Sequence, residues 1–147
     1  MKTLKYEIEI NAPSKVVWER MLEPETYKEW AKGFSSESQY NGEWRQGTYI
    51  NFFDPNMGGT RALLEKVVPC REIFARHVAI LDKEQNEDNE GDFAKKWIGS
   101  TESYSFNETD GVTTLSIITE TDEAFEKMFS DSWPKALELL KEVCERE

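Results

Sequence analysis

The sequence predicts an α+β fold in which a curved antiparallel sheet wraps around one long C-terminal helix. Three observations support this prediction. Residues 123–146 carry apolar side chains at three- and four-residue steps, the spacing of one helix face. Residues 34–81 form short extended runs between turn residues, and two further runs follow at 100–106 and 112–121. The aromatic stripe of the helix needs a broad apolar cover, which only the strand segments can supply.

The N-terminal third is expected to hold one strand and two short helices. Residues 2–11 alternate apolar and polar side chains, which predicts a half-buried strand. Ser14 is expected to cap a short helix that carries Val17, Trp18, Met21 and Leu22 at helical spacing and ends at Pro24. Pro24 suits the first position of a second helix, because its missing N–H is no loss there. Gly33 is expected at the C-terminal cap of that helix.

The middle of the chain predicts an antiparallel meander, since its connections are short. Asn41-Gly42 is typical of a hairpin turn, and so is 109–111. Pro69 and Cys70 indicate a corner, and 54–59 has the composition of a loop. The strands are expected at residues 36–40, 43–45, 48–53, 62–68, 72–81, 100–106 and 112–121.

The helix over 123–146 contains Pro134, which predicts a kink there or a break with a fresh start at Trp133. Residues 82–92 are strongly acidic and predict a solvated loop. Part of this loop matches the first positions of a calcium-binding loop, but the twelfth position is Trp97 instead of glutamate. We therefore expect no metal site there.

Composition limits the function. A chain of 147 residues is expected to form a single domain, 1–147. Its net charge of −11, with no basic cluster, argues against nucleic acid and anionic membranes as partners. No stretch approaches the roughly 18 apolar residues of a membrane span. The N-terminus lacks the apolar core of a signal peptide, so a cytoplasmic location is expected. Cys70 and Cys144 are expected as reduced thiols, with a disulfide left open.

Four segments together resemble a known superfamily. They are Ile8 to Trp18, Leu22-Glu23-Pro24-Glu25 leading to Trp30, Asp110 to Ile117, and Ser132-Trp133 followed by two leucines. In this order they are similar to the START-like (SRPBCC) superfamily, and within it to single-domain relatives of the activator of the heat-shock chaperone ATPase. The resemblance implies the helix-grip fold, with a cavity between the sheet and the long helix. The activity is not implied, because this fold carries many functions.

The aromatic side chains are the strongest candidates for a ligand site in such a cavity. At each position the alternative is an ordinary core residue. Arg61, Arg76 and His77 could anchor polar groups, but strand alternation places Arg76 with Phe74 and His77 on the opposite face. The candidate cavity residues are Trp30, Phe34, Tyr49, Phe53, Phe74, Arg76, Trp97, Tyr104, Phe129 and Trp133.

Catalysis has little support in the sequence. His77 is the only histidine, and no second histidine or cysteine lies at metal-ligand spacing. Glu65 and Glu72 lie on neighbouring predicted strands and could face each other as paired acids. We expect neither His77 nor the Glu65–Glu72 pair to act as a catalyst, and we expect no cofactor.

Three functions therefore remain as hypotheses. The first is a non-enzymatic protein that binds a small hydrophobic molecule such as a lipid, as a monomer or homodimer. The second, implied by the resemblance, is a protein-interaction module that modulates a heat-shock chaperone ATPase in a stress response. The third is a cyclase-like enzyme that uses the cavity, and the lack of a nucleophile–base motif argues against it.

Overall fold

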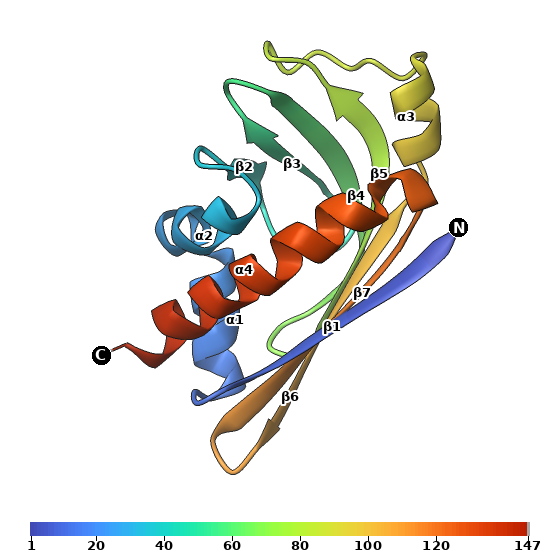
Figure 1. The fold of residues 1–147 in the computed structure, drawn as a ribbon. Helices are drawn as coiled ribbons and strands as arrows, with labels where there is room; N and C mark the ends of the chain where they lie inside the picture. Colours follow the sequence, from blue (N-terminus) through green and yellow to red (C-terminus); the bar gives the residue numbers. More distant parts are fainter. Residues whose placement is uncertain (147) are drawn as a thin grey trace.

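The computed structural model describes residues 1–146 and has the predicted α+β architecture (Figure 1). Within those residues seven strands form one antiparallel sheet, in the order β1-β7-β6-β5-β4-β3-β2. The strands are β1 (Lys2–Ile10), β2 (Gln39–Gly42), β3 (Tyr49–Asp54), β4 (Gly58–Val68), β5 (Glu72–Leu81), β6 (Thr101–Thr109) and β7 (Val112–Thr121).

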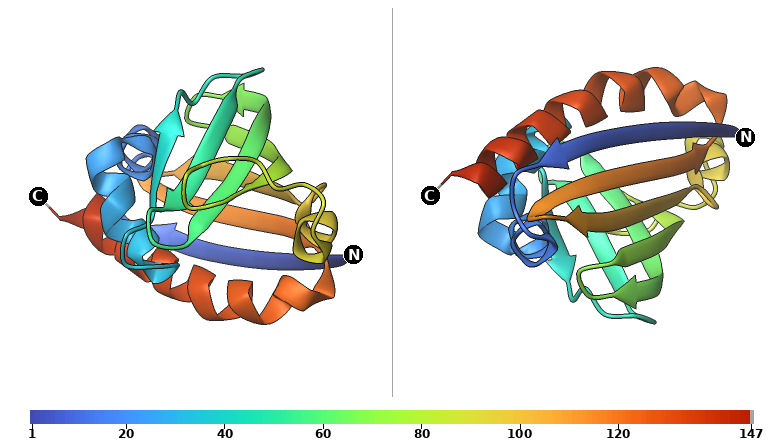
Figure 2. Two further views of the ribbon diagram at one scale, coloured as in Figure 1. Left: turned by 90° about the horizontal axis from the view of Figure 1, so that it is seen from above. Right: turned by 90° about the horizontal axis from the view of Figure 1, so that it is seen from below.

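The long helix α4 (Glu126–Glu145) crosses the concave face of this sheet, as predicted (Figures 1 and 2). The short helices α1 (Ser14–Leu22) and α2 (Pro24–Trp30) pack beside its C-terminal half. Two single-turn 3-10 helices, η1 (Ala31–Gly33) and η2 (Glu123–Phe125), precede β2 and α4. The buried face of α4 is the predicted stripe: Phe129, Trp133, Ala136, Leu137, Leu140, Val143 and Cys144.

The predicted break in the long helix does not occur. The helix continues from Glu126 to Glu145 with Pro134 inside it. Proline has no N–H for the carbonyl of residue 130, one turn earlier. Ser130 and Pro134 both lie on the exposed side of the helix, so water can reach the freed carbonyl.

Two local predictions in the N-terminal half were wrong. Asn41 and Gly42 belong to β2 and pair with Asn51 and Ile50 of β3, so the chain turns after them. Ser14 makes no capping hydrogen bond at the start of α1. Its hydroxyl instead lies 3.3 Å from the Thr113 hydroxyl on β7, which links α1 to the sheet.

Two further corrections concern residues after β3. The sequence did not predict α3 (Asp92–Trp97), a short helix that follows the acidic loop. The Glu65 and Glu72 carboxylates do not face each other, because Glu65 bonds Arg76 at 2.8 Å and Glu72 bonds Lys66 at 2.6 Å. The predicted hairpin turn at 109–111 is confirmed, with positive φ at its last two residues.

The predictions about a membrane span, a metal site and the two cysteines can be compared with residues 1–146. None of its helices has the length and apolarity that a membrane crossing requires. Among residues 1–146 no group of three or more metal-ligating side chains is placed to hold an ion. Cys70 and Cys144 are both free thiols, and burial raises the pKa of Cys144 to about 12.

Gly33 is required by close packing and has no positive φ, in contrast to the predicted capping role. A Cβ at this position would lie 2.5 Å from the backbone nitrogen of Ala136 and 2.6 Å from its Cα. The turn after α2 therefore fits against α4 only because residue 33 has no side chain.

We predict that Gly33→Ala lowers the free energy of unfolding by about 1–3 kcal/mol or more, because the α4 backbone cannot move away from the added methyl group. Chemical denaturation measures this change. Gly91→Ala is the matched control, since its Cβ would meet nothing closer than 3.9 Å, and it should cost less than about 1 kcal/mol. Equal effects of the two variants would contradict the packing argument.

Candidate functional site

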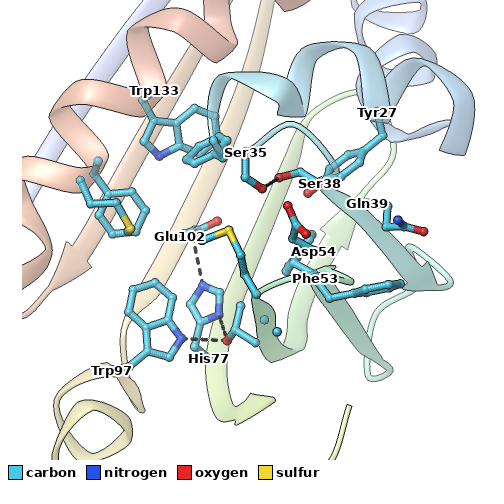
Figure 3. Close-up of a pocket in the computed structure, with 18 of the residues that line it drawn as sticks. Tyr27, Ser35, Ser38, Gln39, Phe53, Asp54, His77, Trp97, Glu102 and Trp133 are labelled. Carbon is cyan, nitrogen blue, oxygen red and sulfur yellow. Dashed lines mark hydrogen bonds and ion pairs between the residues drawn. The ribbon is translucent and has the colours of Figure 1, made fainter. Parts of the chain in front are cut away.

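A cavity of about 350 Å³ lies between the sheet, α2, α3 and α4 (Figure 3). Aromatic rings from six elements and two loops make up most of its wall. They are Tyr27, Trp30, Phe34, Trp44, Phe52, Phe53, Phe93, Trp97, Tyr104, Phe125, Phe129 and Trp133. A cavity of this size and lining is at the lower end of the range for small-molecule sites.

The structure brings seven of the ten predicted site residues to this cavity: Trp30, Phe34, Phe53, Trp97, Tyr104, Phe129 and Trp133. The other three do not line it. Tyr49 is 56% exposed at the start of β3. Phe74 and Arg76 alternate with the buried residues of β5, so they lie on the outer face, where the guanidinium sits 5.8 Å from the phenyl centroid.

Strand alternation also decides which basic groups can reach the cavity. Arg61 lies outside, where its Nε donates to Asn51 Oδ1 at 2.9 Å and its guanidinium pairs with Glu87. Arg76 pairs with Glu65 on the outer face. Of the three polar anchors that the sequence offered, His77 alone lines the cavity, and it is fully buried.

A chain of hydrogen bonds crosses the sheet side of the cavity (Figure 3). The Tyr104 hydroxyl donates to Glu102 Oε2, and Glu102 Oε1 lies 3.0 Å from His77 Nε2. His77 Nδ1 lies 3.0 Å from the Thr60 hydroxyl, which also accepts from Trp97 Nε1 at 2.7 Å. Three strands and α3 thus contribute to one buried polar cluster.

A β-bulge helps to place His77 in this cluster. On β4 and β5, Arg61 pairs with Ala79 but Ala62 pairs with His77, so Val78 has no partner in the ladder. Past Arg76, β5 leaves its regular pairing with β6, and the His77 backbone bonds Ser100 O and Gly99 N at 2.8 and 2.9 Å. Bulges of this kind redirect side chains beside binding sites.

Both imidazole nitrogens of His77 have partners inside the protein. An ionised carboxylate can only accept hydrogen bonds. The His77 Nε2 that faces Glu102 therefore carries a proton and donates it. Burial raises the pKa of Glu102, but the charge and hydrogen bond of His77 and the hydrogen bond of Tyr104 outweigh this effect and lower it below its usual 4.5. Burial and the Glu102 charge raise the pKa of Tyr104 well above 10.0, so its phenol stays protonated.

The mouth of the cavity combines one carboxylate with exposed apolar side chains. Asp54 accepts from the Asn56 backbone N–H at 2.8 Å, and this contact is the main reason why its pKa is lowered. Met57, Phe93 and Met128 border the opening and are 71%, 60% and 45% exposed. Apolar side chains left in water around an opening are typical of a binding site.

Two buried donors in the cavity wall, Trp44 Nε1 and Trp133 Nε1, have no partner among the described residues. Trp133 is 2% exposed, and its Nε1 makes no hydrogen bond within the described residues. In Figure 3 this nitrogen lies on the edge of the ring toward Glu102 and His77. A buried N–H without an acceptor costs free energy, which an acceptor in the cavity would recover.

Sequence reasoning missed three of the polar residues here, Asp54, Thr60 and Glu102. Glu102 could have been found, because it alternates with Tyr104 and Phe106 and so occupies a core-facing position in its strand. Thr60 lies between the predicted loop, 54–59, and the next predicted strand, 62–68. No pattern in the sequence shows that Asp54 turns toward the cavity.

Comparisons with known proteins identify the fold. No family model matches the chain, and no curated protein matches it in sequence. The structure is similar to MLL2253 from Mesorhizobium loti, with a TM-score of 0.77 at 15% identity over 99% of this chain and 98% of that one. It is similar to the Aha1 dimer from Colwellia psychrerythraea, with a TM-score of 0.75 at 18% identity over 99% and 97%.

A third solved structure, CalU16 from Micromonospora echinospora, has a TM-score of 0.66 at 17% identity over 97% of this chain and 74% of that one. Identities this low establish the fold and leave the function open. The curved antiparallel sheet, the two short helices after β1 and the long C-terminal helix are the helix-grip fold.

We predict that Glu102→Gln lowers the free energy of unfolding at neutral pH by about 1–3 kcal/mol, the usual contribution of hydrogen bonds to a charged group. Because folding lowers the pKa of Glu102, its contribution is complete above the unfolded pKa of about 4.5 and is lost as the pH falls through the folded value. The free energies of unfolding of the wild type and the variant should therefore converge in acid. Denaturation curves measured from neutral pH downward check this. A constant difference at every pH would contradict this assignment.

Proposed function

We propose that this protein binds a small, largely apolar molecule in the cavity between the sheet and α4. The observation that carries the proposal is an aromatic cavity of about 350 Å³ with a few convergent polar groups. Preformed apolar cavities with a small number of placed polar groups are the usual sites of small-molecule binding.

Burial of apolar surface would supply the affinity. At about 25 cal/mol per Å², a ligand that buries ~250 Å² of apolar surface gains roughly 6 kcal/mol before the cost of association. Trp30, Phe34, Phe53, Trp97, Tyr104, Phe129 and Trp133 would contribute contact surface. Phe52, which the sequence did not single out, would contribute too, since its ring faces Tyr27 at 6.2 Å and Trp44 at 5.7 Å.

We favour binding over catalysis because the only histidine is already occupied. Both ring nitrogens of His77 are held by Thr60 and Glu102. A general base needs a nitrogen within hydrogen-bond reach of the substrate proton. A cyclase-like activity would have to use another group of the cavity lining.

An interaction with a heat-shock chaperone is the second candidate. It is supported by the sequence resemblance and by the fold shared with the Aha1 dimer over 99% of this chain. The dimeric state of that protein also keeps a homodimer open. Measuring the ATPase turnover of the cognate chaperone with and without this protein tests the candidate, and an unchanged turnover would exclude it.

We predict that Phe52→Ala weakens binding of a neutral fluorescent probe of apolar surfaces by about tenfold, because the truncated side chain removes a cavity wall. Phe74→Ala is the matched control, since this phenylalanine is equally half-buried in a strand but lies on the outer face. The control should bind the probe as the wild type does. Titrations monitored by probe fluorescence measure both, and equal losses would place the binding elsewhere.

A further inference from the structure

The cavity that we propose as a binding site has an uneven distribution of charge. Among the described residues that line it, no lysine or arginine is present, whereas Asp54 and Glu102 are both carboxylates. His77 is the one basic side chain, and it is committed to Glu102 and Thr60. The lining therefore carries net negative charge whether His77 is neutral or protonated.

The hydrogen-bond inventory of the inner cluster points in the same direction. The Tyr104 proton goes to Glu102, the Trp97 proton goes to Thr60, and the His77 proton at Nε2 goes to Glu102. The Thr60 hydroxyl has its own acceptors in Ala79 O and His77 Nδ1. The lone pairs left over belong to the Glu102 carboxylate and the Tyr104 oxygen. This cluster thus offers a ligand acceptors, and it keeps its own donors for itself.

Glu102 is the ionised member of the cluster, and it lines the cavity. Its side chain keeps 10% of its surface exposed, against 2% for His77, and both line the cavity. Its lowered pKa keeps it ionised at neutral pH. A ligand that brings a carboxylate or phosphate here would bury a second negative charge without a cationic partner, which is strongly unfavourable.

The aromatic wall of the cavity also favours a cationic ligand. Indole and phenyl faces attract cations that lie within about 6 Å of the ring centroid. The lining rings include Trp30 and Trp133, which stack with centroids 6.1 Å apart, and Tyr104, whose centroid is also 6.1 Å from that of Trp133. The unpartnered Nε1 donors of Trp44 and Trp133 can each be satisfied by a neutral ligand oxygen, so neither of them requires an anion.

We propose that the cavity selects apolar molecules that carry a protonated amine, with the ammonium group donating to Glu102, and that it rejects molecules with a carboxylate or phosphate head group. This inference rests on the proposed binding function. It makes the hydrophobic wall responsible for affinity and the Glu102 carboxylate responsible for the choice of head group.

The test compares three ligands with one chain and different head groups: decylamine, decanol and decanoate. Each competes at neutral pH with the neutral fluorescent probe, below its micelle-forming concentration. The amine should bind at least about tenfold more tightly than the acid, with the alcohol between them. A carboxylate that binds as tightly as the amine, or an alcohol that binds more tightly, overturns the inference while leaving the proposed function intact. If neither the probe nor any of the three binds, the proposed function itself fails.

Two variants of equal charge locate the selecting group. Glu102→Gln should bring the amine and the acid to within about threefold of each other. Glu65→Gln is the matched control, because it removes the same charge from the outer face, where Glu65 pairs with Arg76. It should leave the preference for the amine unchanged. An equal loss in both variants would show that the net charge of −11 attracts the amine, and this result would overturn the inference.

Circular dichroism establishes that both variants are folded. If Glu102→Gln does not fold, the order of the three ligands on the unmodified protein still decides, and their binding is then measured again at high salt. A preference for the amine that persists at high salt supports a buried partner, whereas loss of the preference indicates surface attraction and overturns the inference.

Discussion

The packing of Trp133 against the concave side of the sheet is the contact on which the rest of the structure depends. This indole is almost fully buried and sits in the middle of α4. It packs against Trp30 of α2, Phe34 after η1, Tyr6 of β1 and Tyr104 of β6, with ring centroids 4.9–6.4 Å apart. One side chain therefore fixes the distances from α4 to α2, to the turn after α2, and to both the edge and the middle of the sheet.

That distance also leaves the cavity open. On the C-terminal side of Trp133 the fit is tight, since Gly33 approaches the Ala136 backbone with no room for a methyl group. On its N-terminal side the helix stands over β4 and β5, where Thr60 and His77 extend only short or planar side chains toward it. The same helix thus packs closely against the turn after α2 at one end and covers the cavity at the other.

The sequence could predict the scaffold because its signals are local and periodic. The helical stripe from Phe129 to Cys144 and the alternation in residues 72–81 each depend on one element alone. Alternation even placed His77 opposite Phe74 and Arg76 correctly. Including Phe74 and Arg76 among the cavity residues was therefore an error that the same rule could have prevented.

The remaining features depend on contacts between elements, which no local pattern contains. Asn41-Gly42 has the composition of a turn, but pairing with β3 keeps it extended. Gly33 looked like a helix cap, although the approach of a distant helix explains it. The polar cluster needs a bulge beside Val78 and a short helix that delivers Trp97, and neither leaves a signature in the neighbouring residues.

The buried Glu102–His77 pair is difficult to explain by stability alone. Removing two ionisable groups from water costs more than their attraction usually returns, and well-packed apolar residues of similar size are often as stable or more so. Here the pair lies against a cavity, with Tyr104 and Thr60 holding its outer atoms. Apolar residues in place of Glu102 and His77 would preserve the hydrophobic core. They would remove the ionised carboxylate of the inner polar cluster from the cavity lining. The cost of burying this pair is therefore better explained by the binding function that we propose for the cavity than by the stability of the fold.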